Sequence, residues 1–229
     1  MRAPCDSPER LAGRARAFTL VELLVVVALV GVLVAAGAAG LGRGGGLARE
    51  TAAALLASRV VQARELAVSR GRAVRLLVHA DAAAPDRYLR LLALIVQSGE
   101  GWALVDDGCA LPEGVVVLPP AGPASVGPGL VAAAGADWSR PSGGLLRSTA
   151  LADASADAAP PEFLGTKRWL YVHFSATGGV FAGDLVVASA RRQDAAKPVT
   201  LLCEHPDAVV GVALSSYGVP TAARGRTEF

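Results

Sequence analysis

The stretch AFTLVELLVVVALVGVLVAAG, from Ala17 to Gly37, decides how the rest of the sequence is interpreted. Glu22 is its only charged residue, and it stands near the start of the stretch. From Phe18 to Leu41 the length matches the roughly 20 residues that a helix needs to cross a bilayer. A charge in the middle of such a segment costs roughly 2.5–3.5 kcal/mol, so the presence of Glu22 requires a reason.

The residues before this stretch carry the net charge of the chain. Residues 1–17 contain four arginines against Asp6 and Glu9, a balance of 4 − 2 = +2, which equals the formal charge of the whole chain. By the positive-inside rule, the short N-terminus is expected to stay cytoplasmic while the rest of the chain is exported. Because the remaining basic and acidic side chains cancel, the net charge predicts neither nucleic acid nor an acidic substrate as a partner.

Two general interpretations account for part of this pattern. In the first, Thr19 and Glu22 form a capping box, in which both side chains satisfy backbone N–H groups of the first helical turn. In the second, the stretch is a secretory signal peptide with an A-x-A cleavage site at Ala36–Ala38. The second interpretation gives Glu22 no role, because the apolar region of a signal peptide does not need an acid.

The residue order RARAFTLVELL, residues 14–24, resembles the class III signal sequence of type IV prepilins and type II secretion pseudopilins. In that family a membrane-embedded prepilin peptidase cuts before the Phe, and the new N-terminus is usually methylated. The resemblance therefore implies cleavage between Ala17 and Phe18, with N-methylation on Phe18. The family normally has Gly before the cut, whereas this sequence has Ala17, so we expect slower or less complete processing.

The resemblance also implies a role for Glu22. After cleavage it is the fifth residue of the mature chain, and Phe18 carries a free α-amino group. A carboxylate in apolar surroundings is costly alone and tolerable when it is paired with a cation. In the family this Glu is thought to meet the N-terminal amine of a neighbouring subunit, so Glu22 is the predicted assembly residue. Capping of its own helix is compatible with that role.

A glycine-rich stretch follows the apolar segment. Glycine stands at 40, 42, 44, 45 and 46, and each glycine within a helix costs roughly 1 kcal/mol relative to alanine. From Leu47 to Arg70 apolar residues return at helical spacing, and Gly71 is a natural C-cap. The segment 42–71 is therefore predicted to be a glycine joint followed by an amphipathic helix that lies across a sheet.

Residues 72–229 have the pattern of a β-rich domain. Short runs of Val, Leu and aromatic residues alternate with turn signals such as Thr177-Gly178-Gly179. The expected strands are Val74–His79, Tyr88–Gln97, Val115–Leu118, Trp169–Phe174, Leu185–Ala188, Val199–Cys203 and Val209–Leu214. Loop insertions are expected near 119–161, at Pro119–Gly129 and Leu151–Pro161. The predicted fold class is α+β: a long N-terminal helix, taken as transmembrane, followed by a pilin-like head of antiparallel sheets or a sandwich.

Three segments of this second half resemble the head of the GspH/FimT group of minor pseudopilins and minor pilins. They are LLASRVVQARELAVSRGRAVRLLV, LPEGVVV near 111–117, and VHFSATGGV at 172–180. In that group the long helix ends in a comparable passage and a β-sandwich follows. The insertions around 119–161 have no counterpart in the group.

No residues of the head form a pattern that predicts an active site. His79, His173 and His205 are isolated from one another and from any metal-ligand spacing, and Ser175 and Ser215 lack the pattern of a nucleophile elbow. Cys109 and Cys203 are consistent either with a disulfide outside the cytoplasm or with two free thiols. We therefore expect no enzymatic activity, no cofactor, no metal and no small-molecule substrate.

Together these observations predict a filament subunit of a type II secretion system or type IV pilus. Its parts would be a leader at 1–17, a transmembrane and filament-core helix at 18–41, the segment 42–71, and a periplasmic head at 72–229. The implied partners are prepilin peptidase, other pilin or pseudopilin subunits and the bacterial inner membrane, which the chain would cross once.

Two alternatives remain open at this point. One is a FimT-like minor pilin that binds DNA during uptake, for which the only support is Arg224 and Arg226 near the C-terminus. Two arginines in a tail are more often simply solvated, which disfavours DNA as a partner. The other is an exported or signal-anchored β domain of unrelated function.

Overall fold

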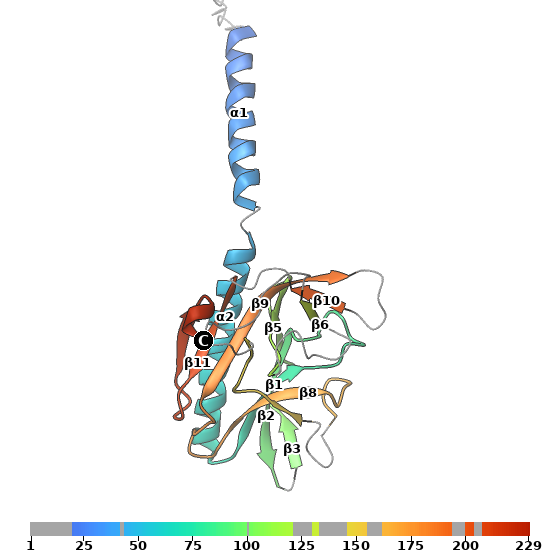
Figure 1. The fold of residues 1–229 in the computed structure, drawn as a ribbon, viewed down its shortest axis with the longest axis vertical. Helices are drawn as coiled ribbons and strands as arrows, with labels where there is room; N and C mark the ends of the chain where they lie inside the picture. The colour runs from blue at the N-terminus through green and yellow to red at the C-terminus, as the bar shows by residue number, and fades with distance from the viewer. Residues whose placement is uncertain are drawn as a thin grey trace, which may run out of the picture. The chain divides into compact units, whose positions relative to one another are not determined.

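The computed structural model describes residues 20–41, 44–99, 101–120, 130–132, 146–154, 162–193, 200–203 and 208–229. The chain divides into two compact units, Met1–Arg43 and Gly44–Phe229. The first unit contains helix α1, Leu20–Leu41. The second unit contains helix α2 and all of the described strands, and we call it the head (Figure 1).

Helix α2 spans Gly44–Arg70 and is the long element of the head. Its fully buried positions recur every three or four residues, the spacing of one helical face, and they are Ala52, Leu56, Val60, Ala63 and Ala67. The helix ends in a Schellman motif: Gly71 has φ 60°, its N–H bonds the Val68 carbonyl, and the Arg72 N–H bonds the Ala67 carbonyl. The predicted C-cap is confirmed.

The start of α2 differs from the expectation. The amphipathic helix was predicted to begin at Leu47, but α2 begins at Gly44 and includes three glycines of the predicted joint. Glycine lowers helix stability without forbidding the conformation, and the rest of the helix is held by tertiary packing, so its first turn can extend into such residues. Residues 42 and 43 lie outside the described residues, so a joint at these positions stays a prediction.

The first sheet is antiparallel throughout. Its strands run in the order β3-β2-β1-β8-β7, with β4 pairing β2. The central strand β1 pairs on both sides, so that Val74 lies opposite Val96 of β2 and opposite Phe174 of β8. The bounds are β1 Val74–His79, β2 Leu91–Ser98, β3 Gly101–Leu104, β4 Cys109–Ala110, β7 Ala152–Asp153 and β8 Trp169–Phe174.

The second sheet runs in the order β12-β11-β9-β10-β6, with β5 pairing β9. Among the strand pairs that the structure describes in this sheet, only β6–β10 is parallel. The bounds are β5 Val115–Val117, β6 Leu130–Ala132, β9 Gly183–Gln193, β10 Thr200–Cys203, β11 Val209–Leu214 and β12 Pro220–Arg224, followed by the 3₁₀ helix η3 at Arg226–Glu228.

The main core lies between α2 and the two sheets. The buried face of α2 joins side chains of β1, β8, β9 and β11 in one apolar cluster, and α2 contacts strands of both sheets (Figure 1). A second, smaller cluster lies on the opposite face of the first sheet, around Leu77, Ile95 and Trp169. The predicted fold class, an N-terminal helix followed by a head of antiparallel sheets, is confirmed.

Several strands were not predicted. Strands β3, β4, β6 and β7 have two to four residues each, too few for an alternating pattern to be visible in the sequence. Strand β7 also corrects the expectation of a loop at Leu151–Pro161, because Ala152 pairs with Tyr171 of β8. Strand β12 corrects the interpretation of the C-terminal residues as a tail, because it pairs with β11 from Pro220 to Arg224.

We expect the fragment 44–229 to fold without the preceding unit, and Leu56→Ala to reduce its stability strongly. Leu56 is fully buried where α2 meets the sheets, so truncation leaves a cavity as well as removing apolar contact. The free energy of unfolding in urea should fall by about 2–5 kcal/mol. Leu47→Ala on the same helix, where the side chain is 75% exposed, should change it by less than about 0.5 kcal/mol. Equal losses in both variants would contradict the helix–sheet interface.

Candidate functional site

The residues of the predicted cleavage site, Ala17 and Phe18, lie outside the described residues. Glu22 is the third residue of α1 and lies in its first turn, but its side chain is not among those described. Cleavage, methylation and the assembly role of Glu22 therefore stay predictions. What the structure does describe is the exposure of the neighbouring side chains on α1.

The described side chains of α1 form an exposed apolar surface. Five consecutive residues, Leu23 to Val27, are each between 49% and 63% exposed. Consecutive residues of a helix point about 100° apart, so five of them face every direction around the axis. A helix that is apolar on all sides is stable only in apolar surroundings, such as lipid or a bundle of similar helices.

Across the described part of the chain, no helix combines the length and the hydropathy required of a membrane span.

The described histidines are structural. His79 at the end of β1 is 1% exposed and packs edge-on against Trp169, with ring centroids 5.2 Å apart. His173 on β8 lies similarly against Trp102, at 6.3 Å. His205 lies outside the described residues. Among the described residues, no three His, Cys, Asp or Glu side chains are grouped as metal ligands would be.

Burial lowers the pKa of His79, an effect that the nearby carboxylate of Asp81 partly offsets. The pKa of Asp81 is itself lowered, first by the backbone N–H of Ala83, which donates to it at 3.0 Å, and also by the Thr166 hydroxyl at 3.2 Å. His79 therefore remains neutral in the folded head at a pH where an exposed histidine would already be charged.

We predict that acidification destabilises the head through His79. Because the folded pKa is below the unfolded value of about 6.5, its contribution is present above that pH and is lost as the pH falls, when the unfolded chain takes up a proton. The free energy of unfolding of fragment 44–229, measured in urea, should decrease from about pH 7 to about pH 5. His79→Phe, which keeps a ring against Trp169, should flatten this decrease; an unchanged slope would assign the titration to another group.

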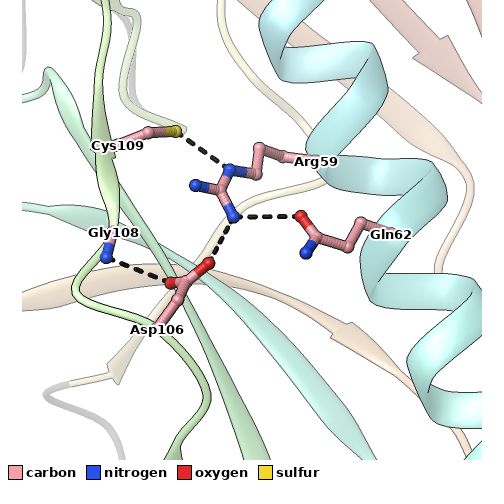
Figure 2. Close-up of polar contacts among 5 residues, drawn as sticks. All are labelled: Arg59, Gln62, Asp106, Gly108 and Cys109. Atoms are coloured by element: carbon pink, nitrogen blue, oxygen red, sulfur yellow. Dashed lines mark hydrogen bonds and ion pairs between the residues drawn. The ribbon is translucent and has the colours of Figure 1, made fainter.

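Arg59 on α2 is the centre of a polar cluster that sequence reasoning missed (Figure 2). Its Nε donates to Cys109 Sγ at 2.9 Å, and one terminal nitrogen donates to Gln62 Oε1 at 2.9 Å and forms an ion pair with Asp106. Asp106 also accepts the Gly108 N–H at 3.1 Å. The cluster fastens α2 to the connection between β3 and β4. The sequence contains no signal for it, because Arg59 and Asp106 are 47 positions apart.

The Arg59 cluster holds a charge in place and offers no catalytic arrangement. Burial by itself would lower the pKa of Arg59, but the bonds to Cys109 and Asp106 raise it above its ordinary value. A permanent cation paired with a carboxylate supplies neither a general base nor an activated nucleophile. Cys109 and Cys203 are both free thiols; Cys203 is buried, which raises its pKa to about 12 and makes it inert at neutral pH.

Asp106→Asn should lower the stability of fragment 44–229 by about 1–3 kcal/mol, because it leaves the partly buried Arg59 cation without its anion. The side chains of Arg59 and Asp106 are only 16% and 29% exposed, so water cannot fully replace the lost charge. Chemical denaturation gives the measurement. Asp107→Asn, the neighbouring exposed carboxylate, is the matched control and should change stability by less than about 0.5 kcal/mol. Equal effects would mean that general charge, and not the cluster, is responsible.

The C-terminal arginines were the only support for DNA binding. Arg224 is part of β12, and its guanidinium forms an ion pair with Glu50 of α2 at 3.2 Å. Because the Glu50 carboxylate neutralises the Arg224 guanidinium, this arginine offers little net positive charge to a DNA phosphate. The side chain of Arg226 is not among those described.

Comparison with known proteins gives one family and one solved structure. Residues 13–38 match the prokaryotic N-terminal methylation motif. No curated protein matches the chain. The minor pseudopilin EpsH from the type 2 secretion system of Vibrio cholerae is similar in structure over 78% of this chain and 96% of that chain, with 12% sequence identity and a TM-score of 0.39.

The matched residues contain the whole of the segment from which the resemblance was drawn, including Ala17, Phe18 and Glu22. Residues 13–38 therefore carry a prokaryotic N-terminal methylation motif, as the resemblance to prepilins and pseudopilins implied.

Proposed function

We propose that this chain is a minor pseudopilin or minor pilin, a subunit of the filament of a type II secretion system or type IV pilus. The observation that carries the proposal is the methylation motif at residues 13–38, which includes most of the apolar helix α1. In this proposal α1 holds the chain in the bacterial inner membrane before assembly, and the head lies in the periplasm. The arginines that precede α1 favour that orientation.

Processing by prepilin peptidase is the first step of the proposed mechanism. Hydrolysis of the bond between Ala17 and Phe18 releases the basic leader and leaves an α-amino group on Phe18. Methylation of this amine retains its positive charge, because a methylated amine is still protonated at neutral pH. Ala17 has the smallest side chain after glycine, which suits a cleavage site that normally accepts Gly.

Assembly then depends on the partner of Glu22. If the helix continues to the new N-terminus, Phe18 and Glu22 stand one turn apart on the same face. In apolar surroundings the carboxylate requires a cation, and the amine of an adjoining subunit supplies one. The subunit is thereby retained in the membrane by the apolar residues of α1 and directed to its neighbour by Glu22. A lone carboxylate in lipid gains more from such a pair than a solvated one would.

The all-round exposure of α1 supports the same sequence of events. Its valines and leucines are accommodated by lipid before assembly and by the helices of other subunits afterwards. Both environments are apolar, so the transfer changes the hydrophobic free energy little, and close packing and charge pairing decide the equilibrium. A free, water-exposed α1 would be unfavourable in either case.

Glu22→Val in the full-length chain should separate anchoring from assembly. The variant should remain in the membrane, because its helix is more apolar, and it should still be cut before Phe18. Its recovery in purified filaments should fall by at least about tenfold, since a lost charge pair in apolar surroundings is worth more than about 1.4 kcal/mol. Immunoblotting of sheared filaments measures incorporation, and mass spectrometry of the N-terminal peptide measures cleavage.

Val21→Leu, an apolar change at the adjacent position, is the control and should be incorporated normally. If Glu22→Val were incorporated as well as the wild type, the role of Glu22 would be limited to capping its own helix. Such a cap is worth only about 0.5–2 kcal/mol. A mature N-terminus near Ala38 in the unaltered chain would instead indicate a secretory signal peptide and would overturn the proposed function.

A further inference from the structure

Two hairpin turns of the head have the same construction. Residues 175–179, SATGG, connect β8 to Val180, and residues 215–219, SSYGV, connect β11 to β12. In each, the glycine at the fourth position has a positive φ, 82° at Gly178 and 72° at Gly218. In each, the N–H of this glycine bonds the carbonyl of the first serine, at 2.8 Å and 2.9 Å. Both are therefore tight turns whose fourth residue has the positive φ that glycine adopts without steric cost.

The serine side chains reinforce the two turns. Ser175 Oγ accepts the Gly179 N–H at 3.0 Å, and Ser215 Oγ accepts the Val219 N–H at 3.2 Å. These serines, which the sequence left without a role, are turn residues that restrain the backbone. The residues that the turns present are consequently held in place before any partner arrives.

The two turns pack against each other and against α2. The Val180 N–H bonds the Ser216 carbonyl at 3.0 Å, which joins one turn to the other. A side chain on Gly218 would come within 2.8 Å of the Gly178 carbonyl, and one on Gly178 within 2.9 Å of Val68. We call the turns 175–179 and 215–219, with Phe181, Arg64 and Val68, the turn surface.

The turn surface carries most of the exposed large apolar side chains of the head. Of the six that the described residues include, four belong to it, and they are Val68 at 52%, Phe181 at 84%, Tyr217 at 76% and Val219 at 51% exposure. A hollow of about 280 Å³ beside Phe181 is lined by His173, Ser175 and Ser216, among others. Rigid loops that expose aromatic rings next to a hollow are typical of binding surfaces.

The same surface is basic. Arg64 donates its Nε to the Tyr217 carbonyl at 2.8 Å, and within the described part of the chain its two terminal nitrogens make no hydrogen bond and no ion pair. Arg70 and Arg72, at the end of the same helix, are exposed and likewise form no ion pair with a described residue. Glu65 is the one carboxylate of this helix end, residues 64–72. The bond to Tyr217 fixes the guanidinium, so its two outer nitrogens are ready to bind a carboxylate side by side.

We propose that the turn surface is a docking site for a partner protein, through a segment that carries a carboxylate next to an aromatic or aliphatic side chain. Arg64 would bind the carboxylate, and Tyr217 and Phe181 would pack against the apolar side chain. Tyrosine and arginine are the residues that most often dominate interface energy, and preorganised turns reduce the entropy lost on binding. Val68 and Val219 favour a peptide over a nucleic acid, because aliphatic side chains neither stack on bases nor bind phosphate.

The test uses the full-length chain in detergent micelles and a random-peptide phage library as the probe. Peptides that bind should be enriched in Asp or Glu next to an apolar residue. A selected peptide, synthesised with a fluorophore, should lose at least about tenfold in affinity for Tyr217→Ser and for Arg64→Lys, which keeps the charge but not the two-nitrogen geometry. Its affinity for the unaltered chain should also weaken with added salt.

Two matched controls lie outside the turn surface. Leu47→Ser removes an equally exposed apolar side chain from α2, and Arg87→Gln removes an arginine that, like Arg64, donates to a backbone carbonyl, here that of Leu164. Both should bind the peptide within about twofold of the unaltered chain. Because the side chain of Tyr217 is mostly exposed, Tyr217→Ser should retain the near-UV circular dichroism of the folded head, so a loss of binding cannot be attributed to unfolding.

Four results would overturn the proposal. They are selected peptides without carboxylates, equal losses in the controls, displacement of the peptide by a single-stranded oligonucleotide with higher affinity, and self-association of the chain that Tyr217→Ser abolishes. The third would assign the surface to nucleic acid and the fourth to a second copy of this chain. None of these results depends on filament assembly, so they leave the proposed function to its own test.

Discussion

The packing of one helix against two sheets is the interaction on which the head depends. The buried face of α2 contacts β1 and β8 of the first sheet and β5, β9, β11 and β12 of the second. Its small residues, Ala52, Ala63 and Ala67, let the helix lie close to the strands, and Leu56 and Val60 are fully buried in the apolar cluster that α2 forms with both sheets. The Arg59 cluster adds a polar attachment to the β3–β4 connection, and Arg64 adds one to the turn at 215–219. Without α2 the two sheets would lose their common apolar partner.

The length and period of each element determined how much of this fold the sequence could predict. Strands β1, β8 and β11 have six residues each and were predicted with their observed bounds, as was the C-cap at Gly71. The two-residue strands β4 and β7 exist only because a longer strand pairs with them. Their sequences, Cys-Ala and Ala-Asp, have no strand preference of their own, so tertiary context decides their conformation. The same holds for β12, which was interpreted as a tail and contains Pro and two Ala residues.

The functional residues also differ in how far the sequence alone could predict them. A linear motif such as residues 14–24 can be recognised directly, because all of its residues are neighbours in one segment of the sequence. The turn surface is different, since it brings together residues 64, 68, 175–181 and 215–219. The turn at 175–179 was recognised in the sequence from Thr177-Gly178-Gly179, but nothing in the sequence indicates that it shares a hydrogen bond with the turn at 215–219. Contacts between distant segments become visible only when the register of β8, β9 and β11 is known.

Strand β12 has a consequence for how the head can associate with other chains. It is the last strand of its sheet, and such an edge normally offers N–H groups to any extended segment nearby. Pro220 has no N–H, and the N–H of Arg224 is taken by the Glu228 side chain. The Gly225 N–H bonds the Val209 carbonyl of β11, and the N–H groups of successive strand residues point alternately toward β11 and away from it. Ala222 is therefore the single residue of β12 with a free N–H that points away from the sheet. This edge thus offers a further strand few N–H donors, which disfavours the extension of the second sheet at β12.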